Sequence, residues 1–572
     1  MPVLRVFPFL FLSWCLLSRS ALAAPNIVLV SIDTLRADHL PMYGYQTQTT
    51  PFLASMAKKG IVFDHVITPM PSTTPSHGSM LTGQYPSRHG STALSVPIHR
   101  EADTIAEALA RNGYYTAGAV AVSHIGRAGN FDQGFADFSG PEGAQRNGDA
   151  VNLDLFKFVA RWRKTSARKP LFLFAHYFDC HSPYGWWRGE QTDPATLPVR
   201  ERIARYDESI RHADQLIADL HAHLGSLGLL ENTIFIVTAD HGEQIGDRGL
   251  SVGHADIYGE TVYVPLIVFG SAIPTARVAE TVSTLDITPS IAAAAGVKLR
   301  GPIDGRDILP RRGDAMQTAL YKLRGLPDSD REFLVLGNPW YTRSVSLYSG
   351  SHVFIRNFDR VYRDFGQAPL KTVSAAERAR WKPLPLLKES KGERLYAVPA
   401  TSYQPFMTTI DVLSAESGCA GTLNVSMPPG MAYFSADLGP AAHTRVQFDG
   451  ARLDTFRVTL PPACKADVFY RLDRPADAPA VPASSRVPRL FWLLMAERKQ
   501  RNTDELYDLE KDPGMLKNLI DEPRMKGLRT RLDQRTRELY GLIYGNAADA
   551  RKNISILPPE EIEKLKSLGY LF

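Results

Sequence analysis

Small hydroxyl residues gather ahead of a histidine in the stretch Pro71–Gly83, P-S-T-T-P-S-H-G-S-M-L-T-G. A hydroxyl is a weak nucleophile until a base or a metal ion favours its ionised form. Ser72, Thr73 and Ser76 are therefore candidates for an ester-cleaving group if such a partner lies elsewhere in the chain.

Acidic and histidine residues follow three predicted strands and could supply that partner: Asp33, then Asp179 with His181, then Asp240 with His241. Carboxyl ends of parallel strands meet at one edge of a sheet, so we expect these residues close together. An Asp–His pair directly after a buried strand can present a carboxylate and an imidazole to one cation. The sequence thus predicts a site for one divalent metal ion beside a hydroxyl nucleophile.

The elements that position these residues alternate between strand and helix from Asn26 to about Pro310. Three apolar runs end in polar residues, as central parallel strands buried on both faces do: 26–33, 170–179 and 233–243. Residues 104–120 are predicted as helix, glycine stop and strand, and residues 205–225 carry apolar side chains at helical spacing. We predict an α/β fold with a mostly parallel sheet sandwiched by helices.

The chain is expected to divide into five parts: a signal peptide (1–23), a catalytic α/β domain (24–320), a connecting segment (321–384), a β-rich insert (385–480) and a C-terminal α+β subdomain (486–572). The apolar run after Arg5 is too short to span a bilayer, and Ala21-Leu22-Ala23 suits signal-peptidase cleavage. We therefore expect a secreted or periplasmic protein without a transmembrane anchor.

Net charge and cysteine content bear on the expected partners and on disulfide formation. The formal net charge of +5 is spread along the chain, so nucleic acid is not an expected partner. In an oxidising compartment Cys419 and Cys464 could form a disulfide within the insert, which leaves Cys180 odd. The insert's own partner is not predicted.

Several ordered blocks of the sequence resemble the sulfatase family, within the alkaline phosphatase superfamily. They are N-I-V-L-V-S-I-D-T-L-R-A-D-H, T-T-P-S-H-G-S-M-L-T-G, H-Y-F-D-C-H-S-P-Y, T-A-D-H-G-E, G-H-A-D-I-Y-G-E and the tail E-L-Y-D-L-E-K-D-P. The resemblance covers roughly residues 25–310 and parts of 486–572, but not the insert. It implies the fold of that family and the hydrolysis of sulfate or phosphate esters.

Two positions depart from the family pattern. Sulfatases carry Cys/Ser-x-Pro-x-Arg, and the Cys or Ser is oxidised to formylglycine. Aligned on Pro75, this chain has Thr73 as the nucleophile and His77 in the place of the substrate-binding arginine. Threonine has a methyl group on its β-carbon and cannot become an aldehyde, so no formylglycine is expected. A sulfated threonine lacks the second hydroxyl that expels sulfate, whereas water can attack a phosphorylated threonine; phosphate esters are therefore favoured.

The resemblance also implies roles for the other residues. Asp33, Asp240 and His241 become metal ligands, with Thr73 completing the site. Because this chain has Thr34 where relatives often have a second acid, and His241 where they have Asn, Mn²⁺ or Zn²⁺ is more natural than Ca²⁺.

Two further histidines take catalytic roles by the same resemblance. His181 assists the leaving group as a general acid with a near-neutral pKa, and His254 contacts the transferred group where sulfatases have a lysine. The expected substrate is a small-molecule, glycan or lipid ester.

Other interpretations stay open. Asp179 is either a second metal ligand or a turn residue that holds His181, and Asp38 and His39 are interpreted as capping or packing residues. A transferase that passes the phospho group from Thr73 to an alcohol uses the same chemistry. A binding or scaffold protein on a sulfatase fold is the alternative from another class.

Overall fold

The computed structural model describes residues 24–544 except 142, 144, 191, 193, 195, 196, 248–251, 255, 272, 311–330, 338–341, 361–381, 384, 385, 391, 392, 398–406, 415–420, 426–433, 439–442, 450–454, 460–465 and 474–503. Side chains are not described at 342, 343, 357–360 and 544, nor in the strands between 382 and 473. The predicted signal peptide and the predicted Cys419–Cys464 disulfide lie outside the described residues.

An eight-stranded sheet forms the centre of the N-terminal half, in the order β4-β3-β5-β1-β6-β7-β2-β8. Its strands are β1 (Asn26–Ile32), β2 (Ile61–Ile67), β3 (Tyr115–Ala119), β4 (Asp137–Ser139), β5 (Leu171–Tyr177), β6 (Thr233–Ala239), β7 (Leu266–Gly270) and β8 (Ala276–Ser283). β7 pairs antiparallel with β6 and β2, and the other pairs are parallel. The predicted mostly parallel sheet is confirmed.

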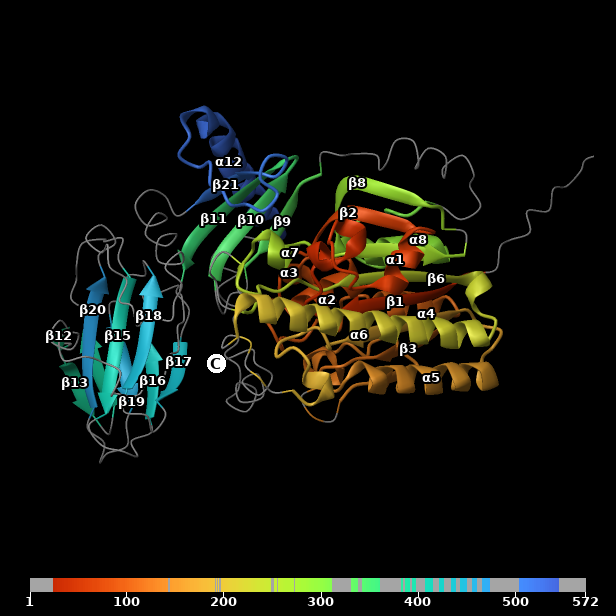
Figure 1. The fold of residues 1–572 in the computed structure, drawn as a ribbon, viewed down its shortest axis with the longest axis horizontal. Coiled ribbons are helices and arrows are strands. Elements are labelled where there is room, and N and C mark those ends of the chain that lie inside the picture. The colour runs from red at the N-terminus through yellow and green to blue at the C-terminus, as the bar shows by residue number, and fades with distance from the viewer. Residues whose placement is uncertain are drawn as a thin grey trace, which may run out of the picture.

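Helices cover both faces of this sheet (Figure 1). They are α1 (Pro51–Ala57), α2 (Thr73–Thr82), α3 (Pro86–His89), α4 (Ile105–Arg111), α5 (Gly148–Thr165), α6 (Val199–Ser226), α7 (Gly259–Val262) and α8 (Ile287–Ala295). α5 and α1 pack against α6, whereas α2 and α4 pack against α8. The predicted helix–glycine–strand order at 104–120 is confirmed: a capping box of Thr104 and Glu107 begins α4, and Gly113 separates it from β3.

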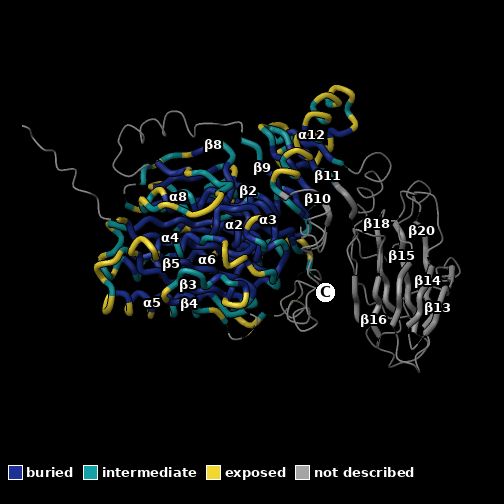
Figure 2. The backbone as a smooth tube through the Cα atoms, turned by 180° about the vertical axis from the view of Figure 1, so that it is seen from behind, coloured by how far each residue is buried: buried dark blue, intermediate teal, exposed yellow. Residues whose placement is uncertain are grey.

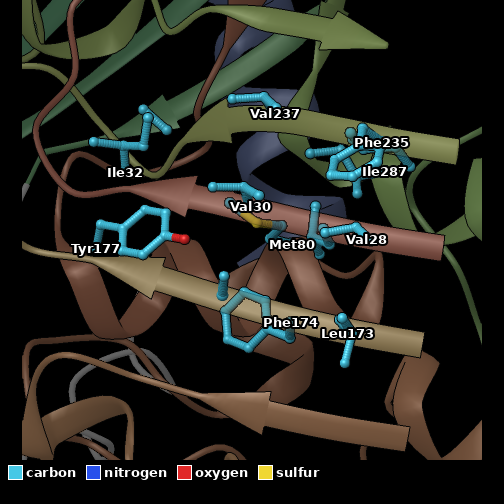
Figure 3. Packing of buried hydrophobic residues seen from close by; sticks show 14 of the residues in the cluster. Val28, Val30, Ile32, Met80, Leu173, Phe174, Tyr177, Phe235, Val237 and Ile287 are labelled. Atoms are coloured by element: carbon cyan, nitrogen blue, oxygen red, sulfur yellow. The ribbon is translucent and has the colours of Figure 1, made fainter. Parts of the chain in front are cut away.

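The core lies between the sheet and its helices. All seven residues of β1 are buried, as are those of its neighbours β5 and β6. In Figure 3, Met80 from α2 and Ile287 from α8 lie among the apolar residues of these strands. Burying one such side chain is worth about 1.5–3 kcal/mol, so the strand ends are held on a rigid base.

A second, smaller sheet is antiparallel and has the order β21-β11-β10-β9. It combines β9 (Phe333–Leu336), β10 (Thr342–Ser349) and β11 (His352–Arg360) with β21 (Glu505–Asp508) from the C-terminal part. Helix α12 (Lys526–Tyr544) packs against this sheet. Many residues of α12 are exposed, whereas the strands of the central sheet are mostly buried (Figure 2).

The strands between residues 382 and 473 form two more antiparallel sheets, ordered β12-β20-β15-β18 and β13-β14-β19-β16-β17. They are β12 (Lys382–Pro383), β13 (Leu386–Ser390), β14 (Glu393–Ala397), β15 (Met407–Ser414), β16 (Gly421–Val425), β17 (Phe434–Leu438), β18 (His443–Asp449), β19 (Thr455–Thr459) and β20 (Ala466–Asp473). Among the described helices, none is both long and apolar enough to cross a membrane.

Candidate active site

Two neighbouring strands bring the predicted metal ligands together. β1 pairs with β6 in a register that sets Ile32 opposite Ala239, so Asp33 and Asp240 leave adjacent strand ends. His241 follows directly and is also fully buried. One ligand atom from each of Asp33, Asp240 and His241 lies within 4.8 Å of the other two. Of the strand-end residues expected to lie close together, the fold thus gathers Asp33, Asp240 and His241.

The carboxylates of this cluster are poorly compensated. Asp33 Oδ1 and Asp240 Oδ2 are buried and have no hydrogen-bond partner, although Asp240 Oδ1 accepts from the backbone N–H groups of Thr34 and His241. Burial raises the pKa of Asp33 well above its ordinary value, and burial together with the Asp33 charge raises the pKa of Asp240 to about 7. Two buried carboxylates with unsatisfied oxygens fit a bound cation, because a cation offsets the cost of burying them.

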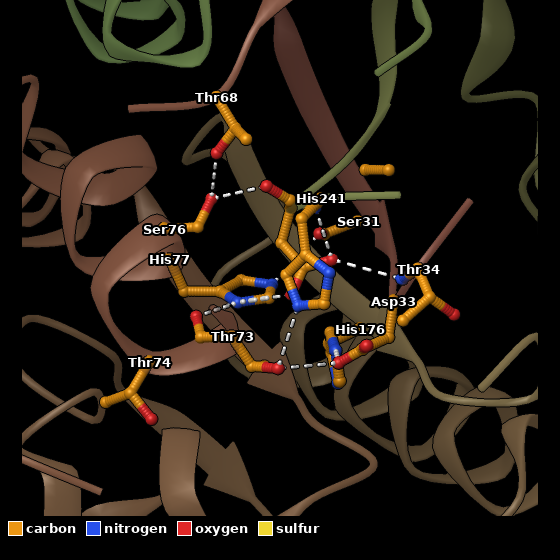
Figure 4. A network of polar contacts seen from close by, with 12 residues as sticks. Ser31, Asp33, Thr34, Thr68, Thr73, Thr74, Ser76, His77, His176 and His241 are labelled. Atoms are coloured by element: carbon orange, nitrogen blue, oxygen red, sulfur yellow. Dashed lines mark hydrogen bonds and ion pairs between the residues drawn. The ribbon is translucent and has the colours of Figure 1, made fainter. Parts of the chain in front are cut away.

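Thr73 lies at the edge of this cluster. It is the first residue of α2, and its Oγ1 lies 3.3 Å from Asp33 Oδ2 and 3.3 Å from His241 Nε2 (Figure 4). The unpaired N–H groups and the dipole of a helix N-terminus favour negative charge there. Thr73 is therefore the hydroxyl that the fold brings to the candidate metal ligands.

Of the neighbouring hydroxyls, those of Ser76 and Thr74 are engaged elsewhere, whereas the buried Ser72 Oγ has no hydrogen-bond partner. Ser76 Oγ donates to the backbone oxygen of Asp240 at 2.7 Å and contacts Thr68 at 2.9 Å. Thr74 points away from the cluster, and its Oγ1 accepts from the backbone N–H of Ser95 at 3.0 Å (Figure 4). Ser72 is the residue before α2, where its side chain makes no capping hydrogen bond.

Both ring nitrogens of His77, the predicted substrate-binding residue, contact protein groups. Its Nδ1 donates to the backbone oxygen of Thr73 at 2.8 Å, so in the neutral ring Nε2 accepts from Ser31 Oγ at 2.9 Å. The ring is fully buried, and burial lowers its pKa to about 3. With both ring nitrogens bound to protein, His77 supports the first turn of α2 in this structure.

His176 belongs to the site although the sequence did not single it out. The backbone N–H of Ala121 donates to its Nδ1 at 3.3 Å, which leaves the proton on Nε2, 3.3 Å from Asp33 Oδ2. Its ring also meets the His77 ring edge to face at 4.8 Å. Ligand carboxylates are commonly oriented by such hydrogen bonds. No sequence signal marks it, because β5 is buried on both faces and shows no alternation.

His254 lies next to the candidate metal ligand His241, and His181 lies next to His254. The ring centroid of His254 is 4.3 Å from that of His241 and 5.9 Å from that of His181. Burial lowers the pKa of His181 to about 3 and that of His254 well below its ordinary value. The expected near-neutral pKa of His181 is therefore wrong for this structure, because burial disfavours the imidazolium.

The other residues singled out in the sequence, Asp179, Asp38 and His39, lie outside the cluster of candidate metal ligands. Asp179 Oδ1 accepts from the backbone N–H of Gly148 at 3.1 Å and lies 3.2 Å from His212 Nε2, which links the turn after β5 to α5 and α6. His39 Nδ1 lies 2.9 Å from Asp207 Oδ1. Asp38 pairs with Arg36. These contacts match packing and turn-holding roles.

Comparisons with known proteins agree with this geometry. Residues 25–297 match the family model described as Sulfatase. Human (Homo sapiens) arylsulfatase A is 28% identical over 391 residues, which cover 57% of this chain and 76% of that protein. Choline-sulfatase from Rhizobium meliloti (strain 1021) is 23% identical over 364 residues, which cover 50% of this chain and 71% of that protein.

Two solved structures share the fold. One, described as a 2-O GAG sulfatase, has a TM-score of 0.52 at 14% identity and covers 94% of this chain and 96% of its own. The other, in complex with its substrate D-glucosamine-2-N,6-O-disulfate, has a TM-score of 0.55 at 14% identity and covers 91% of this chain and 99% of its own. From the match over residues 25–297 and the shared α/β fold, these residues form an ester-hydrolase domain of the sulfatase family.

Proposed function

We propose that this chain hydrolyses phosphate esters with the Thr73 hydroxyl as the nucleophile. The observation that carries this proposal is the position of Thr73 Oγ1 at the N-terminus of α2, 3.3 Å from both Asp33 Oδ2 and His241 Nε2. A divalent cation held by Asp33, Asp240 and His241 would favour the ionised hydroxyl and offset the charge of the ester. This ligand set favours Mn²⁺ or Zn²⁺ over Ca²⁺.

The protein's own groups then have distinct tasks. Thr73 Oγ1 forms a bond to phosphorus as the bond from phosphorus to the ester oxygen breaks, and the N-terminus of α2 favours the negative charge at Thr73. His254 donates a hydrogen bond to a non-bridging oxygen. An anionic ester raises the pKa of the nearby imidazoles, so His181 can deliver a proton to the leaving oxygen. Water next attacks phosphorus, which releases phosphate and restores the Thr73 hydroxyl.

The side chain of Thr73 is the reason for favouring phosphorus over sulfur. Its β-carbon carries a methyl group and one hydrogen, so oxidation cannot produce the aldehyde from which a second hydroxyl forms. Without that hydroxyl a sulfated Thr73 has no internal route to expel sulfate. A phosphorylated Thr73 is open to in-line attack by water.

Sulfate esters of glycans are the second candidate. Two observations favour them. The relatives include human arylsulfatase A, and one solved structure with the same fold contains its substrate D-glucosamine-2-N,6-O-disulfate. This candidate requires an exit for sulfate that does not use formylglycine. Phosphate esters remain the better match to Thr73.

We also propose that the protein is exported to the periplasm or the exterior, with residues 1–23 as its signal peptide. The proposed boundaries are 24–320 for the catalytic domain, 385–480 for the insert and 486–572 for the C-terminal subdomain.

Release of nitrophenol from matched aryl phosphate, phosphodiester and sulfate substrates tests the function. The mature protein would be loaded in turn with Mn²⁺, Zn²⁺ and Ca²⁺, and Thr73→Ala compared with Thr73→Ser. We expect phosphate turnover that Thr73→Ala abolishes and Thr73→Ser largely retains. Preferential sulfate turnover by the unmodified Thr73 enzyme would overturn the phosphate assignment. A protein that binds metal yet releases nothing would point to a transferase, and one that binds no metal to a scaffold.

A further inference from the structure

The segment that carries His254 is held by hydrogen bonds at two places. At its start, Gly253 exchanges backbone hydrogen bonds with Gln244, at 2.6 and 3.1 Å. Further on, Thr261 Oγ1 donates to the backbone oxygens of Asp256 at 2.6 Å and Tyr258 at 3.0 Å. The first attachment joins the segment to the turn after the metal ligands. The second lies within the segment and fixes the turn from which the Tyr258 side chain extends.

Tyr258 reaches the C-terminal part of the chain. Its hydroxyl lies 3.2 and 3.1 Å from the two carboxylate oxygens of Glu505, the first residue of β21. Tyr258 is fully buried and Glu505 is 1% exposed, so solvent does not compete with this contact. Tyr507 also donates its hydroxyl to Glu505. Hydrogen bonds to a carboxylate are stronger than those between neutral groups, particularly in a buried setting.

Packing around this contact joins the same two regions. Ile257 and Tyr258 share an apolar cluster with Phe333, Val335 and other residues of the small antiparallel sheet. The same sheet holds the chain just before the nucleophile, since the N–H of Leu336 in β9 donates to the oxygen of Pro69 at 2.9 Å.

His254 belongs to one of these two segments and contacts the other. Its Nδ1 is 3.4 Å from the oxygen of Pro71, two residues before Thr73. The sheet formed by β9, β10, β11 and β21 therefore holds both the approach to Thr73 and the segment of His254.

We propose that Tyr258 and Glu505 are a positioning pair that fixes His254 against the transferred group, so that strand β21 sets the geometry of a site it does not touch. The inference rests on the proposed function, because it assumes that His254 contacts the transferred oxygens. A misplacement of about 1 Å in such a group can cost up to about 100-fold in rate.

The test uses the Mn²⁺-loaded full chain, with nitrophenyl phosphate as substrate and inorganic phosphate as competitive inhibitor. Tyr258→Phe removes the donating hydroxyl, and Glu505→Met removes the accepting carboxylate with little change of side-chain length. We expect each to lower kcat/KM and to raise the inhibition constant of phosphate by roughly ten- to 100-fold. The double variant should be no worse than either single one, and bound Mn²⁺ should be unchanged.

Two further proteins separate positioning from general loss of structure. Asp508→Asn alters the same strand, but Asp508 pairs with Lys511 at 2.6 Å, and it should behave as wild type. In a His254→Ala background, Tyr258→Phe should not change the phosphate inhibition constant, because its effect acts through His254. A further change there, or an equal loss in Asp508→Asn, would overturn the inference.

The failure of this inference is distinguishable from failure of the proposed function. A wild type that turns over phosphate esters, with Tyr258→Phe indistinguishable from it, overturns only the positioning pair. A wild type without turnover of phosphate esters overturns the function itself.

Discussion

Two charged clusters lie close to the end of β1 and differ in how their charges are compensated. Asp33 and Asp240 are fully buried, each with one carboxylate oxygen that lacks a hydrogen-bond partner. A few residues on, the buried Arg36 pairs at 2.7 Å with the exposed Asp38 and at 2.7 Å with the half-buried Asp247.

The pKa values of the two clusters shift in opposite directions. Burial raises the pKa of Asp33 and Asp240, whereas in the second cluster Arg36 prevails over burial and lowers the pKa of Asp38 and Asp247. Uncompensated buried charge costs stability, and it persists where a ligand compensates it. The contrast supports the first cluster as the proposed metal site, whereas the charges of the second pair with one another.

The largest expected effect comes from removing one carboxylate of each cluster. Asp240→Ala should abolish both stoichiometric metal binding and phosphate-ester turnover, because it deletes one of the three candidate ligands. Asp247→Ala, the matched change in the compensated cluster, should retain both. Metal content and nitrophenol release check the pair. Equal behaviour of the two variants would end the distinction between the clusters.

His176→Asn is expected to come next. Loss of the hydrogen bond from His176 Nε2 to Asp33 Oδ2 should weaken metal affinity by about 10–100-fold, as for other residues that orient a ligand. His39→Asn removes a buried histidine–aspartate contact outside the site and is the control. Metal titration by competition with a chelator measures both. Unchanged affinity in His176→Asn would remove this residue from the site.

The stability of the metal-free protein should fall as the pH rises, because the pKa of the Asp240 carboxyl is raised in the folded state. The folded state raises the pKa of Asp240 from 3.8 to about 7, so between these values the folded form binds more protons than the unfolded form. Its contribution to stability is therefore present at low pH and is lost as pH rises through about 7. Urea unfolding between pH 4 and 8 checks this, and Asp240→Asn should flatten that part of the profile.

In the metal-free protein, neutralising one acid of each cluster should change the stability in opposite directions and by a smaller amount. Above a pH of about 7, where Asp240 is ionised, Asp240→Asn should stabilise the metal-free protein, because the amide keeps an oxygen for the N–H groups of Thr34 and His241 without the charge. Asp38→Asn should destabilise it by at most about 1 kcal/mol, since its ion pair with Arg36 is exposed on the Asp38 side. Melting temperatures that shift in the same direction would contradict the comparison.

The sequence predicted the cluster of Asp33, Asp240 and His241 because parallel strands place their carboxyl ends on one edge. It could not identify His176, since a strand buried on both faces shows no alternation from which an inward-facing histidine stands out. The contacts of His77 with Ser31 and the lowered pKa of His181 depend on packing between segments far apart in the chain. The antiparallel direction of β7 is likewise a tertiary choice that its apolar pattern does not encode.

The most direct test of Thr73 as the nucleophile is to trap the enzyme with phosphate bound covalently to this residue. The metal-loaded protein would be quenched in acid during turnover of nitrophenyl phosphate, and its peptides analysed by mass spectrometry. We expect phosphate on Thr73 in the wild type and none in Thr73→Ala. Turnover with phosphate on another side chain, or with an oxidised residue in the place of Thr73, would contradict this expectation.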